Sequence, residues 1–500
     1  MEIIRWLEEA EAQRTLFSDE NSVVTYGDFR TKAKNIASAL ISRLHVTRKP
    51  IVIFIDRNVQ SICAIFGVIY SGNFYVPVDP SQPVDRIRAM FEQIRPLTVI
   101  EMNASDEVKA AAADFCTILS YDLLASGNYD ENALRKVQEQ ALDDDPLVAI
   151  CTSGSTGVPK AVVKSHRGVI DFIPQFVKTF GFSSDEVFGN QAPFDFDVSA
   201  KDIYSTIYCH ARMHVIPKSC FVMPKKLIDC LNEQKVSTII WSVSAVCIPS
   251  CFNAFKYDIP HSLRNVLFSG EQMPMKQMNI WRRYMPQVRY VNLYGPTEMM
   301  GNCMYYVLDR EFADTEVLPL GKVFTNQEVL ILDDNGKRIE QGEMGEICIR
   351  GSILALGYYR DPERTAQVFR QNPEHNDYPD RIYHTGDLAV LNERGEYVFA
   401  SRKDFQIKHM GHRIELGEID TYASAIENMR RVCCVFDTAR NKIVLFYDGP
   451  IEKTEVIVEL KKKLPKYMIP NVFVKLENMP LNKNGKIDRN ALKEMLNDVR

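Results

Sequence analysis

Residues 152–160 combine glycines, small hydroxyl side chains and a lysine in a spacing that could bind phosphate. Gly154 and Gly157 allow backbone conformations in which several N–H groups point at one anion. The side chains that could add hydroxyl donors and a positive charge are Thr152, Ser153, Ser155, Thr156 and Lys160. The stretch is not a Walker loop, because Val158 and Pro159 separate its last glycine from the lysine. A Gly/Ser surface turn is the alternative interpretation.

Apolar runs and segments of helical spacing alternate around this loop and must position it. The run 147–150 leads directly into the loop and predicts a buried strand. The other predicted strands cover residues 50–55, 74–79, 212–216, 238–241, 265–268, 328–332, 345–350 and 396–399. Helices are predicted around residues 33–40 and 61–70, whereas residues 106–145 are expected to form surface helix and loop. The alternation predicts an α/β fold of twisted sheets flanked by helices.

The character of the chain changes after Asp404. A smaller unit of roughly a hundred residues is predicted there, with its own strands at 432–436 and 442–447 and a helix at 455–464. We therefore expect a large N-terminal domain over residues 1–402 and a small C-terminal α+β domain over residues 403–500.

Length and composition exclude several classes of protein. The chain has 500 residues, too many for one compact core, and 46% apolar with 25% charged residues is typical of globular proteins. The net charge of −5 gives no basic field for nucleic acid. Residues 1–10 resemble an amphipathic surface helix and not a signal peptide, and no run is long enough to span a bilayer. We expect a cytoplasmic protein without membrane insertion, whose twelve cysteines are reduced thiols.

Further motifs follow the glycine-rich loop in a fixed order. They occupy residues 194–199, 292–298, 383–387, 401–408 and 484–489. Together with residues 152–160 they resemble the adenylate-forming superfamily, which includes acyl-CoA synthetases, luciferases, adenylation domains of nonribosomal peptide synthetases and D-alanine–carrier protein ligases. The resemblance extends from Val24 to Arg489. Residues 190–194, 404–408, 411–416 and 467–470 are most similar to the amino-acid-activating branch.

The resemblance implies two half-reactions that use ATP and Mg²⁺. An amino acid is first converted to an aminoacyl-adenylate with release of pyrophosphate, and the aminoacyl group is then transferred to the phosphopantetheine thiol of a carrier protein. Because the chain ends soon after the last motif, we expect the carrier to be a separate protein. Asp404 would be the hinge about which the C-terminal domain rotates between the two reactions, and Gly411 would line the thiol channel. One departure is Ser401, where the family usually has glycine.

The resemblance also assigns the nucleotide site. Lys486, Arg402 and Glu298 would be catalytic, with Lys486 bridging the substrate carboxylate and the α-phosphate and Glu298 binding Mg²⁺. The nucleotide-binding residues would be Thr152, Ser153, Ser155, Thr156, Lys160, Gly270, Glu271, Asn292, Tyr294, Gly295, Thr297, Asp387, Arg402 and Lys486. Without the resemblance, a lysine in a polar loop such as 482–486 is an ordinary solvated side chain, and the neighbouring Lys483 is not expected to be the catalytic lysine.

Asp197 separates amino-acid ligases from ligases of other acids, because the resemblance pairs its carboxylate with the substrate ammonium. A helix cap is the alternative role. The substrate-binding positions would be Asp197, Val198, Lys201, Ile240, Leu267, Ser269, Leu293, Gly301 and Asn302. Lys201 leaves the substrate open: an inward ammonium favours an acidic or hydrogen-bonding side chain, whereas pairing with Asp202 or with water leaves an apolar pocket. Since long lysines usually reach solvent, we do not expect an acidic substrate.

The sequence thus predicts an ATP-dependent, AMP-forming amino acid ligase, either a D-alanine–carrier protein ligase or a stand-alone peptide synthetase adenylation domain. The main alternative is an acyl-CoA synthetase for an acid without an amine, which Asp197 disfavours. A luciferase-like oxygenase and a non-catalytic binding protein are further alternatives, and the presence of Lys486 and Glu298 argues against the latter.

Overall fold

Two large sheets form the body of the molecule. The structure is a computed structural model, and it describes residues 1–153, 159–481 and 487–496. The first sheet has nine strands, in the spatial order β15 (Lys322–Val323), β14 (Met304–Val307), β13 (Arg289–Tyr294), β12 (Asn265–Ser269), β11 (Thr238–Ser242), β9 (Val187–Asn190), β10 (Arg212–Val215), β1 (Thr15–Ser18) and β2 (Val23–Thr25). The strands from β13 to β1 run parallel, and β2, β14 and β15 are antiparallel additions at the two edges.

The second sheet has seven strands, in the order β18 (Gly357–Tyr358), β8 (Lys160–Ser165), β7 (Pro146–Thr152), β4 (Phe74–Val78), β3 (Pro50–Phe54), β5 (Thr98–Glu101) and β6 (Thr117–Ser120). One of its strands differs from expectation. The stretch expected to be surface helix and loop contains β6, which pairs with β5 at the sheet edge. The segment after the glycine-rich loop returns as β8, antiparallel to β7, so that the loop joins two neighbouring strands.

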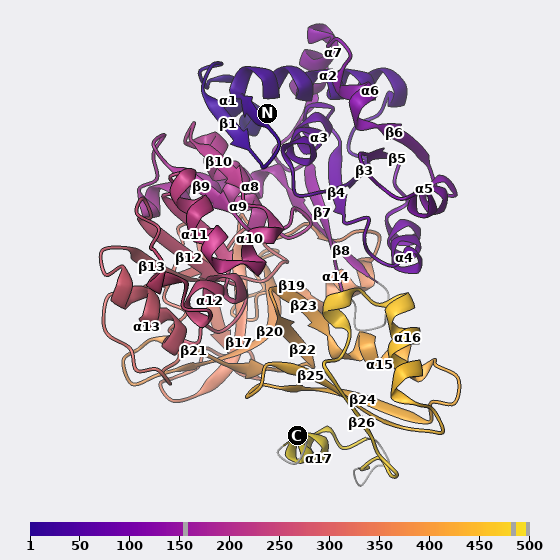
Figure 1. Cartoon of the computed structure of the whole chain (residues 1–500), viewed down its shortest axis with the longest axis vertical. Coiled ribbons are helices and arrows are strands. Elements are labelled where there is room, and N and C mark those ends of the chain that lie inside the picture. Colours follow the sequence, from indigo (N-terminus) through magenta and orange to yellow (C-terminus); the bar gives the residue numbers. More distant parts are fainter. Residues whose placement is uncertain (154–158, 482–486, 497–500) are drawn as a thin grey trace.

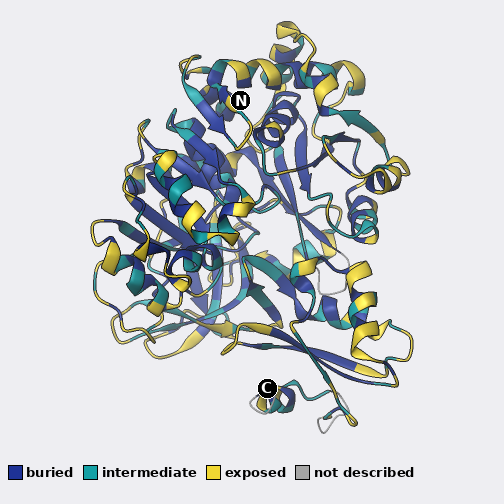
Figure 2. Cartoon of the chain, viewed as in Figure 1, coloured by how far each residue is buried: buried dark blue, intermediate teal, exposed yellow. Residues whose placement is uncertain are grey.

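Helices cover both large sheets, and Figure 2 shows the strands between them as buried. Those of the first half are α1 (Glu2–Glu8), α2 (Tyr26–Leu44), α3 (Val59–Tyr70), α4 (Val84–Ile94), α5 (Asp106–Ala113), α6 (Tyr121–Ala125), α7 (Glu131–Gln140), α8 (His166–Phe180) and α9 (Val198–Tyr208). They continue with α10 (Lys218–Val222), α11 (Pro224–Glu233), α12 (Val243–Cys251), a 3₁₀ turn (Ala254–Lys256), α13 (Met275–Tyr284) and α14 (Pro362–Val368). Helices begin where the sequence supplies a cap: the side chains of Thr25 and Asn58 accept backbone N–H groups of α2 and α3.

A third sheet of five strands connects the body to the C-terminal part. It consists of β16 (Gln327–Leu332), β17 (Met344–Gly351), β20 (Arg381–Leu391), β19 (Phe369–Gln371) and β21 (Tyr397–Arg402), where β21 pairs with β20. Then follow the hairpin β22 (Gln406–His409) and β23 (His412–Glu415), helix α15 (Leu416–Ser424), strands β24 (Arg431–Asp437) and β25 (Lys442–Asp448), helix α16 (Lys453–Lys463), a 3₁₀ turn (Lys466–Met468), strand β26 (Val472–Lys475) and helix α17 (Arg489–Met495).

The C-terminal residues have hydrophobic clusters of their own. Side chains such as Ile414, Leu445 and Val456 form one cluster, and Val444, Phe446 and Leu492 form another on the other face of β25. This part lies at the end of the molecule opposite the N-terminus (Figure 1). The division at residue 402 remains a prediction, whereas the mixed α/β fold is observed directly.

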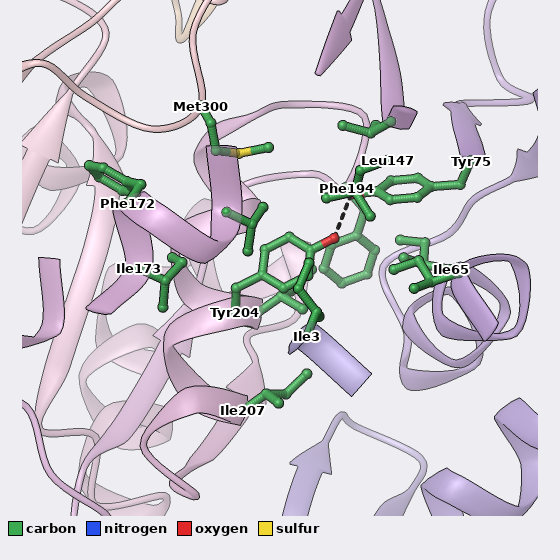
Figure 3. Close-up of a cluster of buried hydrophobic side chains, with 14 of the residues drawn as sticks. Ile3, Ile65, Tyr75, Leu147, Phe172, Ile173, Phe194, Tyr204, Ile207 and Met300 are labelled. Carbon is green, nitrogen blue, oxygen red and sulfur yellow. Dashed lines mark hydrogen bonds between the residues drawn. The ribbon is translucent and has the colours of Figure 1, made fainter. Parts of the chain in front are cut away.

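The largest core cluster holds α9 in place between the two large sheets. Ile203, Tyr204 and Ile207 of α9 pack with Phe172 and other residues of α8. Figure 3 shows this packing, with a hydrogen bond of 3.2 Å between the hydroxyls of Tyr204 and Tyr75, which lies on β4. Because both tyrosines are buried, this bond satisfies two polar groups and fixes α9 relative to the seven-stranded sheet.

Two composition-based expectations can be compared with the structure. All twelve cysteines are free, as expected from the absence of a disulfide framework. No helix within the described residues is long and apolar enough to cross a membrane.

Candidate functional site

Many of the predicted site residues line one cavity at the carboxyl ends of the parallel strands, where open α/β sheets usually bind ligands. Its lining includes Thr152 and Ser153 at the end of β7, Asp197, Val198 and Lys201 at the start of α9, Ser269 and Gly270 at the end of β12, Gly295, Thr297, Gly301 and Asn302 after β13, and Asp387 and Arg402 from the five-stranded sheet. The hairpin β22–β23 adds Lys408, Gly411 and Arg413.

The glycine-rich loop reaches this cavity at its first two residues. Ser153 is buried and donates a hydrogen bond of 2.8 Å to the backbone carbonyl of Arg413. The Thr152 hydroxyl is buried and has no hydrogen-bond partner among the described residues. An unsatisfied hydroxyl in the cavity wall fits a ligand that carries acceptor oxygens, such as a phosphate. Gly154, Ser155, Thr156 and Gly157 lie outside the described residues.

Lys160 and Glu298 lie close together, and both are buried. Lys160 Nζ is 3.6 Å from Glu298 Oε1 and 3.8 Å from Glu415 Oε1. Burial lowers the pKa of Lys160 to about 8, even though both carboxylates favour its charged form. Lys160 is not among the residues that line the cavity in the described part of the chain.

Glu298 is the predicted Mg²⁺ ligand, and both of its carboxylate oxygens are already bonded. Tyr358 donates its hydroxyl to Oε1 at 2.7 Å, and Arg413 donates to Oε2 at 2.5 Å. Burial alone would raise the pKa of Glu298, but the charges of Arg413 and Lys160 lower it below its usual value. Mg²⁺ requires free oxygen ligands and keeps several waters. The residues around Glu298 therefore do not fit a magnesium ion while Arg413 lies against it.

Tyr294, Asp387 and Arg402 form the part of the site to which nucleoside binding was assigned. The Tyr294 hydroxyl donates to Asp387 Oδ2 at 2.6 Å, and Arg402 donates to Asp387 Oδ1. Lys408 lies 5.7 Å from the centroid of the Tyr294 ring. A carboxylate has about four lone-pair sites, so Asp387 still has capacity for hydroxyl donors.

Two of the residues assigned to the nucleotide have other partners. Asn292 donates its side-chain amide to the carbonyl of Pro319 at 3.0 Å, and the Glu271 carboxylate accepts the backbone N–H of Gly411 at 2.5 Å. Neither is among the lining residues of the cavity that the structure describes.

The tip of hairpin β22–β23 consists of Met410 and Gly411, of which Gly411 lines the cavity. Both residues have positive φ, 52° and 81°, as two-residue hairpin turns of type I′ require. A Cβ atom at Gly411 would lie 3.3 Å from the Cβ atom of Ser242, so glycine also allows a close approach to the end of β11. This turn chemistry places Arg413 beside Glu298 and its own carbonyl beside Ser153.

Asp197 lies at the start of α9, but its side chain does not cap the helix. Its Oδ2 atom is instead 3.2 Å from Nζ of Lys164, a lysine of β8 that is only 1% exposed. The carboxylate itself is partly exposed and lines the cavity. Asp197 thus enters the pocket already paired with a cation of the protein.

The expectation that Lys201 reaches solvent is wrong. Its side chain is 2% exposed, lines the cavity, and donates to Asn302 Oδ1 at 2.8 Å. The residue lies on α9 one turn after Asp197, on the face that packs into the protein, so its ammonium faces the cavity instead of the outer surface. The alternative partner Asp202 accepts from Asn190 at 2.8 Å, and no ion pair joins it to Lys201 within the described residues.

The remaining pocket positions divide into two groups. Val198, Ser269 and Gly301 line the cavity. Ile240, Leu267 and Leu293 are buried in the main hydrophobic core and are not among its lining residues in the described chain. Substrate contact by these three remains a prediction.

The structure describes Asp404 but not Lys486. Lys486 lies outside the described residues, so its catalytic role remains a prediction. Asp404 accepts two hydrogen bonds from Arg402, at 2.6 and 2.8 Å, and one from the backbone N–H of Gln406 at 3.1 Å. These contacts lie where β21 ends and β22 begins, at the predicted hinge.

Sequence reasoning missed Lys164 and Arg413. Lys164 ends an otherwise apolar run in β8, and a charged residue on a strand whose neighbours are buried could have suggested a buried partner. Arg413 stands in a motif used for the resemblance, but its contact with Glu298 joins residues 115 positions apart, which no local pattern predicts.

Known proteins resemble this chain along most of its length. A family model described as "AMP-binding enzyme" matches residues 5–359. The chain is 32% identical over 486 residues to bacitracin synthase 1 of Bacillus licheniformis. This match covers 94% of this chain but only 9% of that protein. It is 30% identical over 483 residues to a D-alanine–D-alanyl carrier protein ligase of Staphylococcus aureus (strain MRSA252), which covers 92% of each chain.

A solved structure supports the same fold. Holo-PA1221, an NRPS protein containing adenylation and PCP domains, superposes with a TM-score of 0.84 at 21% identity, over 98% of this chain and 83% of that one. At this identity the likeness shows the fold alone. The predicted resemblance and the predicted fold class are thereby confirmed.

Proposed function

Because the chain belongs to the AMP-binding enzyme family, we propose that it is an ATP-dependent, AMP-forming ligase that activates an amino acid and transfers it to the phosphopantetheine thiol of a carrier protein. One observation carries the proposal: a partly exposed carboxylate, Asp197, lines the same cavity as the start of the glycine-rich loop and the Asp387–Arg402 pair. This arrangement offers an anion for an ammonium group beside donors for phosphate. The D-alanine ligase and the peptide synthases among the relatives support it.

In the first half-reaction, an oxygen of the substrate carboxylate attacks the α-phosphorus of ATP. A P–O bond forms, and pyrophosphate leaves with the electron pair of the bond that breaks. This chemistry needs no nucleophile from the enzyme, only positioning and donors for the charge that develops. Thr152 and Ser153 would donate to phosphate oxygens, Asp387 would accept from ribose hydroxyls, and Lys486 would contact the reacting carboxylate.

In the second half-reaction, the pantetheine sulfur attacks the acyl carbon, a C–S bond forms, and AMP leaves. The thiol proton passes to solvent. The hairpin β22–β23 contributes Gly411 to the cavity wall in the arrangement observed here, and Ser153 is engaged by the carbonyl of Arg413. We therefore assign this arrangement to the thioester-forming stage. Withdrawal of the hairpin would free Ser153 for a phosphate oxygen and Glu298 to hold Mg²⁺, so we assign adenylation to the withdrawn arrangement.

A second candidate function rests on the pair between Lys164 and Asp197. Because Lys164 already neutralises this carboxylate, the pocket does not depend on a substrate ammonium as strongly as an unpaired aspartate would. An acyl-CoA synthetase for an acid without an amine is thus the alternative.

Mass spectrometry of the reaction products separates the two functions. The enzyme is incubated with ATP, Mg²⁺ and a mixture of amino acids, and then with either a pantetheinylated carrier protein or coenzyme A. The proposal predicts an aminoacyl-adenylate, followed by an aminoacyl thioester on the carrier. An acyl-CoA formed only from amine-free acids would establish the alternative instead.

A further inference from the structure

Two buried lysines surround the carboxylate of Asp197. Lys164 approaches from β8 and Lys201 from the first turn of α9, and they are 1% and 2% exposed. Buried ammonium groups are costly unless they are paired, so each requires a partner. Lys164 has Asp197 at 3.2 Å.

Within the described residues, Lys201 has one hydrogen-bond acceptor and no ion pair. The acceptor is the neutral amide oxygen of Asn302, at 2.8 Å. An ammonium group has three N–H donors, so two remain for other acceptors. Burial lowers the pKa of Lys201 to about 8, which leaves most of the side chain protonated at pH 7. The charge persists and lines the cavity.

Neighbouring carboxylates favour this charge but compensate it only in part. Asp197 is engaged by Lys164, and Asp202 accepts its hydrogen bond from Asn190. Burial raises the pKa of Asp202 to about 7, so its negative charge is only partial near neutral pH. With Lys164 and Asp197 cancelling each other, the pocket has an excess of positive charge at Lys201.

Building on the proposed function, we propose that the substrate is an amino acid with a second carboxylate, of the aspartate or glutamate class, whose side-chain carboxylate is bound by Lys201 and Asn302. The amide of Asn302 provides N–H donors for the same group. The substrate ammonium shares Asp197 with Lys164, which a carboxylate permits because each oxygen accepts more than one hydrogen bond. Lys201 is then a specificity-determining residue.

The test is ATP–pyrophosphate exchange with matched pairs of substrates: aspartate against asparagine, glutamate against glutamine, in both enantiomers, and each diacid against its amine-free analogue, succinate or glutarate. Each amide has the same shape as its acid and lacks only the charge. We expect one acid to exceed its amide in kcat/KM by about 10- to 100-fold, as a charged hydrogen bond would give.

The variant Lys201→Met removes the charge at similar volume and is expected to lower that ratio to about one, whereas Lys178→Met, at an exposed position of α8, should leave it unchanged. If the wild-type enzyme favours a neutral amino acid, this inference is wrong and the proposed function stands. If only amine-free acids support exchange, both fail. The wild-type comparison decides the matter even if Lys201→Met does not fold.

Discussion

The guanidinium of Arg413 donates to the buried carboxylate of Glu298 across 2.5 Å, linking hairpin β22–β23 to the loop after β13. The same carboxylate is the one predicted to bind Mg²⁺. Because one carboxylate oxygen cannot serve a guanidinium and a hydrated cation in the same place, the position of the hairpin and the availability of Glu298 are coupled. This coupling is a direct consequence of where Arg413 lies.

Arg413→Met should destabilise the protein markedly. Removing one partner of a buried ion pair leaves a buried charge without compensation and costs about 3 kcal/mol or more of unfolding free energy. Lys160, at 3.6 Å, retains part of the compensation, so we expect the lower end of that range. Thermal unfolding of the variant measures the effect.

The matched control for Arg413→Met is Arg394→Met. Arg394 is 60% exposed and 3.8 Å from Glu316, and a surface pair of this kind contributes about 0–1 kcal/mol. Equal and small losses in both variants would mean that the Arg413–Glu298 pair does not hold the hairpin in solution.

Asp404→Pro should oppose withdrawal of the hairpin from the arrangement observed here and so slow adenylate formation. Proline fixes φ at the predicted hinge and so opposes the rotation between the two arrangements. The part of the chain that the structure describes shows no backbone hydrogen bond from the amide of Asp404 that proline would break. Pyrophosphate exchange reports the first half-reaction, and carrier loading reports the second.

Asp404→Ala is the control for this variant, because it also loses the pair with Arg402 but leaves the backbone free. Pyrophosphate exchange by Asp404→Pro at the rate of Asp404→Ala would show that the hinge lies elsewhere. Loss of both half-reactions in both variants would point to the Arg402 pair instead.

Lys486→Ala should reduce pyrophosphate exchange by at least about 100-fold while ATP still binds, because the lysine is assigned to the charge that develops in the transition state and not to the ground state. Lys483→Ala, three positions earlier in the sequence, should retain near-normal exchange. The reverse pattern would transfer the catalytic role to Lys483.

The preference for an acidic substrate should decline as the pH rises through about 8. The pKa of Lys201 is lowered to about 8 by burial, with Asp197 and Asp202 raising it and Lys164 lowering it further. Binding of an anionic side group needs the protonated lysine, so the preference is full below that pH and lost above it. The ratio of kcat/KM for acid and amide, measured from pH 6.5 to about 9.5, tests this. A flat ratio would remove Lys201 from side-chain recognition.

Local patterns in the sequence predicted most strands. Short apolar runs such as 238–241 and 265–268 are typical of strands buried inside a parallel sheet, and the structure pairs these two there. They failed at Lys201, since the general tendency of lysines to reach solvent does not apply to a residue on the inward face of a buried helix. The pairs Lys164–Asp197 and Arg413–Glu298 join distant segments, and only the fold brings them together.

The measurement that tests the central claim most directly is ATP–pyrophosphate exchange across all amino acids, D-alanine and a set of carboxylic acids without an amine, with wild-type protein and Asp197→Asn. The account predicts exchange that depends on one amino acid or a narrow group, and a loss of at least about tenfold in kcat/KM when the carboxylate of Asp197 becomes an amide. Exchange that proceeds only with amine-free acids, and is unaffected by Asp197→Asn, would contradict it.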